Sequence, residues 1–114
     1  MQAAKPVVST AGAPPVPVIE DIHKKVYAAA TATADSLNMS TWHTCETTHC
    51  RAGWVTVLAG EGGKVLDGVF GTNAAAALIY MASDPTLERI PNFYASADEA
   101  LADMKRLSDA EAGA

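Results

Sequence analysis

The sequence predicts an all-α fold, a compact domain of about five short helices preceded by an extended, Pro/Ala-rich N-terminal tail. In most of the chain, apolar residues recur at steps of three and four, which is the period of an amphipathic helix. Aromatic residues make up only 6% of the chain, a composition that favours small, closely packed helices over a thick β-sandwich. A small β-hairpin at residues 37–46 would compete with this assignment.

Two regions divide the chain, a tail at residues 1–17 and a single helical domain at residues 18–112. The tail is expected to be extended or disordered because four prolines prevent a helix there, at Pro6, Pro14, Pro15 and Pro17. A tail of this kind is either flexible or bound to a partner. The rest of the chain is long enough for one domain with its own core.

The first helix is expected from Val18 to about Ala34. Its apolar face consists of residues three and four apart, namely Ile19, Ile22, Val26, Ala29, Ala30, Thr33 and Leu37. Glu20 and Asp21 fall in the first turn, where the helix dipole favours carboxylates. His23 belongs to this helix and is expected to face solvent.

The second helix is expected at residues 48–59 and should be the most buried one, since few charges interrupt it. Arg51 is expected to point outward as an ordinary surface charge. Gly60 follows the helix, and glycine commonly lies just past a helix end. The inward stripe of this helix comprises Cys50, Gly53, Trp54, Val57 and Leu58.

Three further helices complete the predicted domain. Residues 64–70 suit a short helix, and residues 73–82 are apolar nearly all round, which predicts a second buried helix. Ser96 and Glu99 have the spacing of a capping box at the start of the last helix. The predicted core anchors are Trp42, Trp54, Val57, Leu58, Leu78 and Leu101.

The charge of the chain limits its classes of partner. Thirteen acidic residues against eight basic ones give a net charge of −5. This charge argues against binding nucleic acid or anionic membrane surfaces, because both are held mainly through Lys and Arg. No apolar run approaches the roughly 18 residues of a membrane span, and the N-terminus lacks the apolar segment of a signal peptide. We therefore expect a protein kept in a reducing cytoplasm.

Residues 42–50 (WHTCETTHC) contain both cysteines and two of the three histidines of the chain. Zinc takes four Cys or His ligands, and His43, Cys45, His49 and Cys50 are of the right types. However, adjacent ligands on a helix point about 100° apart, and structural zinc sites usually combine two separated ligand pairs. We expect no cofactor, with zinc as the alternative.

Cys45 suggests two other chemistries. A disulfide to Cys50 requires Cys45 to lie in a loop before the helix, and such a bond would be labile in a reducing cell. Alternatively, Cys45 is a reactive thiolate near the helix start, with His43 or His49 as its base. The sequence offers no clear third catalytic group, so no catalytic residue is assigned and a non-enzymatic role is favoured.

The favoured interpretation of this segment is packing. Cys50 shares a helical stripe with Trp54, and a free cysteine often behaves as a small buried hydrophobe. Trp42 and Trp54 would then anchor the core on either side of a turn. A threonine hydroxyl would cap the helix, from Thr44, Thr47 or Thr48.

Residues 39–54 (MSTWHTCETTHCRAGW) resemble a group of small, uncharacterised proteins encoded by bacteriophages, prophages and related mobile elements. The shared pattern is Cys-(Gly or Glu)-Thr-x-x-Cys-x-Ala-Gly-Trp, and the likeness extends to Gly71, Thr72 and residues 74–80 and 91–94. The resemblance implies an origin in such elements, with the protein in the cytoplasm of a bacterial host or associated with a virion. It implies no catalytic role for any residue.

Our leading hypothesis is a small acidic accessory protein that acts by binding another protein, either a virion component or a host factor. An acidic surface suits a basic site on the partner, and a homo-oligomer is compatible with the sequence. The second hypothesis is a metal-stabilised or thiol-active module that uses His43, Cys45, His49 and Cys50.

Overall fold

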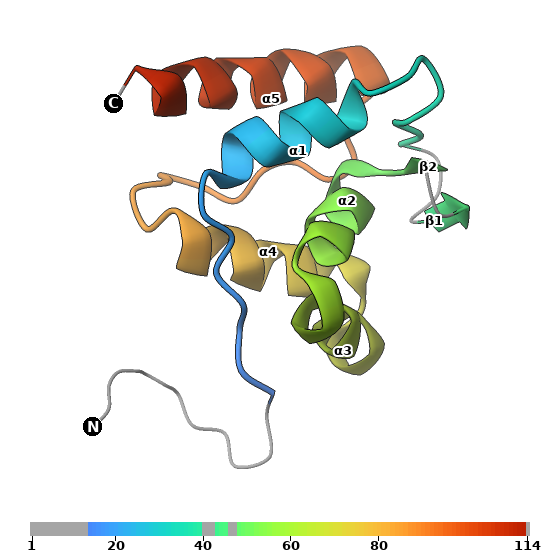
Figure 1. Cartoon of the computed structure of the whole chain (residues 1–114), viewed down its shortest axis with the longest axis vertical. Helices are drawn as coiled ribbons and strands as arrows, with labels where there is room; N and C mark the ends of the chain where they lie inside the picture. Colours follow the sequence, from blue (N-terminus) through green and yellow to red (C-terminus); the bar gives the residue numbers. More distant parts are fainter. Residues whose placement is uncertain (1–13, 40–42, 46–47, 114) are drawn as a thin grey trace.

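The structure is a computed structural model that describes residues 14–39, 43–45 and 48–113. The predicted all-α class is confirmed, and residues 1–13 of the predicted tail lie outside the described part (Figure 1). A short antiparallel pair, β1 (His43–Cys45) and β2 (Thr48–His49), precedes the second helix. The described residues form five helices: α1 (Ile22–Ala30), α2 (Arg51–Leu58), α3 (Gly60–Phe70), α4 (Thr72–Ser83) and α5 (Ala97–Ala112).

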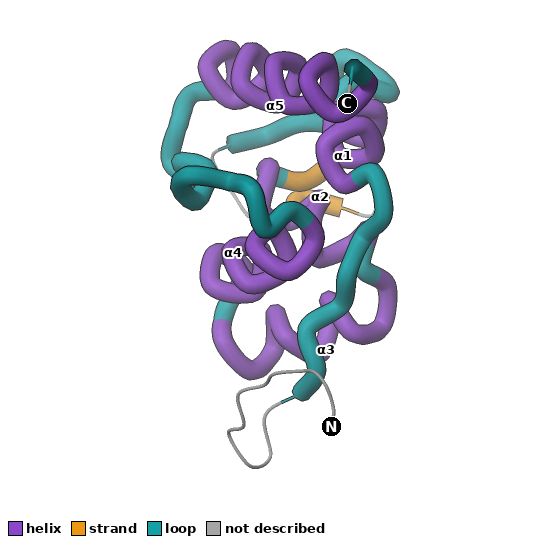
Figure 2. Tube along the Cα trace, turned by 90° about the vertical axis from the view of Figure 1, so that its left-hand side faces the viewer, coloured by secondary structure: helices purple, strands orange, loops and turns teal. Residues whose placement is uncertain are grey.

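The helices are arranged in two layers. Helices α1 and α5 lie side by side and run in opposite directions, with α2, α3 and α4 beneath them (Figure 1). Figure 2 shows the same pairing from the side, with α3 at the far end of the molecule. Helix α2 joins the layers, because it contacts α1 as well as α3 and α4. The centre of the core is fully buried and comprises Ile22, Val26, Val55, Leu66, Ile79, Tyr80 and Met104.

Helix α1 is shorter at both ends than its periodicity predicts. It begins after Asp21, whose φ of 54° places that residue in the left-handed region and turns the chain into the helix. Ile19 is buried outside the helix, with its N–H donating to Oγ of Ser83 (2.8 Å). Beyond Ala30, Oγ of Ser36 accepts the N–H of Thr33 (2.9 Å), a local bond that competes with further helix.

Helix α2 begins at Arg51 because residues 48 and 49 belong to β2. Cys50 takes the N-cap position that a threonine was expected to fill, and its Sγ accepts the N–H of Gly53 (3.3 Å). The later start changes which residues face inward. Helix α2 buries Arg51, Ala52, Gly53, Val55 and Thr56.

Glycines allow α3 to begin directly after α2, four residues earlier than expected. Gly60 has a φ of +71° and turns the chain between the two helices. Gly63 lies where α3 crosses α2, and a Cβ there would come within 2.2 Å of the carbonyl oxygen of Thr56. The two helices therefore approach more closely than a residue with a side chain at position 63 would permit.

The start of α5 agrees with its predicted capping box. Oγ of Ser96 accepts the N–H of Glu99 (3.2 Å), and the carboxylate of Glu99 accepts the N–H of Ser96 (3.1 Å). Both bonds satisfy N–H groups that a helix start leaves unpaired. Helix α4 also forms where the apolar run predicts it.

The chain before α1 runs from α1 down to α3 (Figure 1). Pro17 lies against Gly62, where an added Cβ would be 2.8 Å from Cγ of the proline. Residues 14–17, assigned to the tail from sequence, therefore include a contact with the domain. Among the described residues, no helix has the length and apolar character needed to cross a bilayer.

Candidate functional site

The predicted cysteine–histidine site lies partly outside the described residues. Trp42 and the side chains of His43 and Cys45 are in that part, so the zinc site and the Cys45–Cys50 disulfide stay predictions. The strand pairing sets His43 opposite His49 in the ladder. No group of three or more metal-ligating side chains is found within the part of the chain that the structure describes.

His49 and Cys50 are both buried at the start of α2. The ring of His49 meets the ring of Trp54 edge-on, with centroids 4.6 Å apart, and Nε1 of Trp54 donates to the carbonyl of Ser36 (2.7 Å). Cys50 lies in the core and forms no disulfide within the described part of the chain, and burial raises the pKa of its thiol above the ordinary value. A raised pKa keeps the thiol protonated and therefore a poor nucleophile.

The predicted core anchors divide between core and surface. Trp54, Leu58 and Leu101 are partly buried and pack against the core, while Leu78 is half-buried. Val57 was wrongly assigned to the core, since 43% of it is exposed. The cause is the inward face of α2, which runs through Ala52, Val55 and Thr56 and leaves Val57 on the opposite side.

Arg51 was predicted to be a surface charge, and this prediction is wrong because only 1% of it is exposed. Its Nε donates to Oη of Tyr80 (3.0 Å), and its Nη1 donates to Oδ2 of Asp103 (2.8 Å). The guanidinium also lies 5.4 Å from the centre of the Tyr80 ring. Helix α2 thus carries a buried cation that is neutralised by α5.

His23 was predicted to face solvent, and this prediction is also wrong because 4% of it is exposed. Its Nε2 lies 2.7 Å from Oδ2 of Asp84, and its ring stacks on Tyr80 with centroids 5.8 Å apart. The hydroxyl of Thr86 and then His23 hold the pKa of Asp84 below its usual range. This pair connects α1 to the end of α4.

Tyr80 connects these groups. It is fully buried, and desolvation raises the pKa of its phenol above the ordinary value. The ring touches His23 on one side and Phe93, 6.1 Å away between centroids, on another. The hydroxyl, which accepts from Arg51, gives a buried polar group the partner it requires.

A cleft of about 870 Å³ opens beside this network, between α5, the end of α4 and the connection that follows α4. Burial alone would raise the pKa of Asp103, but hydrogen bonds from Arg106 and Arg51 hold that pKa below its ordinary value. The residues with full charges that line the cleft are Arg51, Asp84, Glu88, Arg89, Glu99, Asp103, Arg106 and Glu111.

Local sequence patterns missed this network because its partners are far apart in the chain. Arg51 meets Tyr80 and Asp103, which lie 29 and 52 residues away. The one available signal was a single arginine inside an otherwise apolar helix, since a buried arginine requires an acidic or aromatic partner. Comparison with protein-family models, with curated proteins and with solved structures finds no match for this chain.

Proposed function

We propose that this protein is a small acidic accessory protein, of the phage or prophage type that its motif resembles, and that it acts by binding another protein. The partner is a virion component or a host factor. The observation that carries the proposal is an exposed apolar surface on and around α3.

We call this surface the α3 face, and it consists of Val57, Val65, Val69 and Phe70. These side chains are 43%, 42%, 58% and 46% exposed. Val65 and Val69 are four residues apart in α3, so they lie on one side of the helix. Exposed apolar side chains that gather on one part of a protein commonly mark a contact with another protein.

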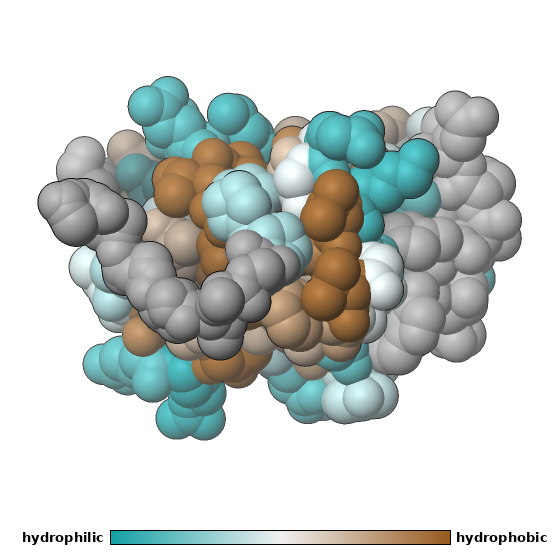
Figure 3. Space-filling view, turned by 90° about the horizontal axis from the view of Figure 1, so that it is seen from below, coloured by the Kyte–Doolittle hydropathy of each residue, from teal (hydrophilic) through white to brown (hydrophobic). Residues whose placement is uncertain are grey.

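The chain before α1 extends the α3 face. Val16 and Val18 are also exposed, and they flank Pro17, which lies against Gly62 of α3. Figure 3 views the molecule from below, where hydrophobic residues gather beside hydrophilic ones. An apolar face on a chain with a net charge of −5 suits a partner whose apolar segment is flanked by basic residues.

A double variant, Val65→Ser with Val69→Ser, tests this proposal. Both side chains are exposed, so the fold should persist while the apolar contact is lost. Tyr94→Ser is the matched control, since Tyr94 is 79% exposed and lies in the connection before α5. Partners captured by the wild-type chain from phage-infected cells should be lost with the double variant and retained with the control. Unchanged capture by the double variant would contradict the proposal. Sedimentation of the purified wild type and double variant shows whether the α3 face instead binds a second copy of this chain.

The ladder position of His43 opposite His49 favours one second candidate, a module stabilised by zinc. The pairing thus brings the backbones of two candidate zinc ligands onto neighbouring strands. Zinc at these residues predicts a stoichiometric metal content and a melting temperature that falls when a chelator is added. Purified protein without metal, and with no response to the chelator, would exclude this candidate.

A further inference from the structure

We propose that the cleft beside α5 binds a small oxyanion, a carboxylate or phosphate group, at the unpartnered Nη2 of Arg51. This site is distinct from the α3 face and does not depend on the proposed protein partner.

Arg51 is one of the residues that line the cleft. Its Nε and Nη1 are engaged by Tyr80 and Asp103, which fix its orientation. Its Nη2 is buried and has no hydrogen-bond partner among the described residues. Proteins seldom leave a buried donor without an acceptor, and a charged donor binds an anionic oxygen more strongly than a neutral one.

Arg51, Arg106 and Asp103 form one charged cluster at the wall of the cleft. Asp103 is shared by two guanidinium groups, since Nη2 of Arg106 donates to its other carboxylate oxygen (2.7 Å). Two cations and one carboxylate leave a positive charge. Arg89 also lines the cleft and forms no ion pair within the described part of the chain.

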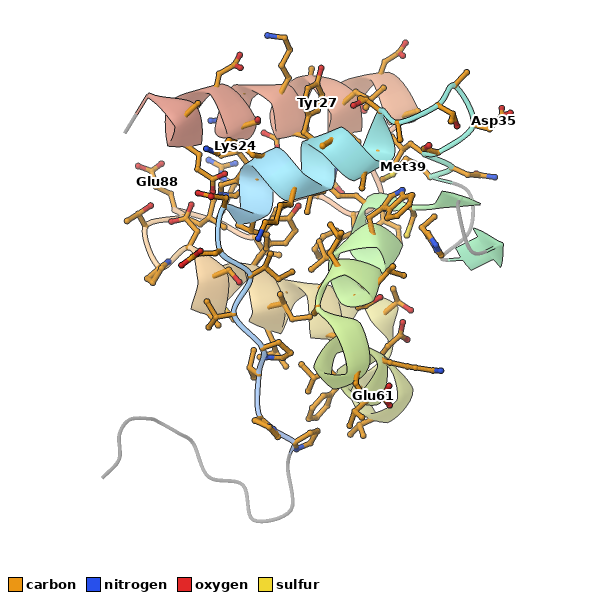
Figure 4. The ribbon with its side chains drawn as sticks, viewed as in Figure 1. Lys24, Tyr27, Asp35, Met39, Glu61 and Glu88 are labelled. Carbon is orange, nitrogen blue, oxygen red and sulfur yellow. The ribbon has the colours of Figure 1, made fainter. Side chains whose placement is uncertain are left out.

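The carboxylates that line the cleft are mostly occupied by bonds within the protein. Asp84 accepts from Thr86 and meets His23, and Glu99 belongs to the capping box of α5. Glu111 accepts the N–H groups of residues 23 and 24 at the start of α1. Glu88 has no bond of this kind and lies at the edge of the molecule near the start of α1 (Figure 4). The donors at Arg51 and Arg89 therefore remain available to a ligand.

Nuclear magnetic resonance of the full chain tests the site directly, because it observes the side-chain N–H groups of Arg51. The probes are inorganic phosphate and succinate, in separate titrations that distinguish the two oxyanions, with 1,4-diaminobutane as the cationic control. We expect a saturable shift of the Arg51 signals, and of the Tyr80 ring, with at least one oxyanion. The diamine should leave both unchanged.

Two variants decide whether the cleft is responsible. Arg89→Gln should weaken the apparent affinity about fivefold, the effect of one exposed charge. Lys105→Gln is the matched control, since Lys105 is on α5 but does not line the cleft. The proposal is overturned if neither phosphate nor succinate gives a saturable shift at concentrations up to about 50 mM, well beyond the range of a specific site. It is equally overturned by a response to the diamine, or by an affinity that Arg89→Gln leaves unchanged.

Discussion

Arg51 places a charged group inside the core and thereby requires polar partners to be buried beside it. It brings a positive charge to a position that is 1% exposed, beside the fully buried phenol of Tyr80. A buried cation is tolerated only when its neighbours replace the lost water. Here the carboxylate of Asp103 supplies the charge, and the hydroxyl and ring of Tyr80 supply a further acceptor and a polarisable surface.

Replacing Arg51 with methionine should therefore destabilise the protein. The substitution keeps much of the side-chain volume but leaves the Tyr80 hydroxyl without its donor, at a cost of about 2–3 kcal/mol. Arg106→Met is the control, because Arg106 is 69% exposed and bonds the same carboxylate, and its loss should cost less than about 1 kcal/mol. Urea unfolding of both variants measures the difference in the free energy of unfolding. Equal losses of that free energy would show that the burial of Arg51 does not increase its contribution to stability.

The two acidic residues of the network predict how stability depends on pH. Asp84 and Asp103 have pKa values below their ordinary range in the folded protein. The folded state therefore binds these protons less readily than the unfolded chain does. The stabilisation is present above the unfolded pKa of about 4 and is lost as the pH falls through the lower, folded pKa values.

Thermal unfolding measured from neutral pH downward should show this loss below about pH 4. Asp103→Asn should flatten the pH dependence, because asparagine cannot take up the proton. Asp98→Asn serves as the control, since Asp98 is an exposed residue in the first turn of α5. A pH dependence that is identical in the wild type and Asp103→Asn would contradict the assignment.

At the level of elements, two glycines of α3 offer a matched comparison. A Cβ at Gly63 would approach the Thr56 carbonyl oxygen to 2.2 Å, whereas a Cβ at Gly68 would meet nothing within 4 Å. Gly63→Ala should separate α2 from α3 and cost about 1–3 kcal/mol or more, as overpacking does. Gly68→Ala should instead stabilise the protein by about 0.5–1 kcal/mol, because alanine favours the helix. Denaturant midpoints of the two variants should shift in opposite directions, and a neutral Gly63→Ala would refute the close approach.

The elements also show which parts of the fold were predictable from sequence. The capping box at Ser96 depends on residues three apart, so the start of α5 was predicted correctly. The ends of α1 and α2 were not, because a left-handed Asp21 and the pairing of β2 interrupt patterns that would otherwise continue. The buried positions of His23 and Arg51 depend on partners in distant elements, which no local pattern contains.

At the scale of the whole molecule, a few polar contacts join the segment around the start of α1 to the ends of α4 and α5. Oγ of Ser83 accepts from Ile19 across 64 residues, and Asp84 meets His23 across 61. The carboxylate of Glu111 lies at the N-terminus of α1, where it accepts the N–H groups of His23 (3.3 Å) and Lys24 (2.8 Å). The end of α5 thus supplies the cap that the side chain of Asp21 does not provide.

Glu111→Gln should weaken this cap without changing the core. A neutral amide interacts less favourably with the positive end of the α1 dipole and offers one acceptor oxygen instead of two, so we expect a loss of about 1 kcal/mol. Glu88→Gln is the control, since Glu88 is exposed and lies outside α1 and α5. Hydrogen exchange should accelerate at the amides of His23 and Lys24 in Glu111→Gln and nowhere in the α2–α4 layer. Unchanged exchange at those two amides would mean that α1 keeps its start without the carboxylate, and that apolar packing holds α1 against α5 without this cap.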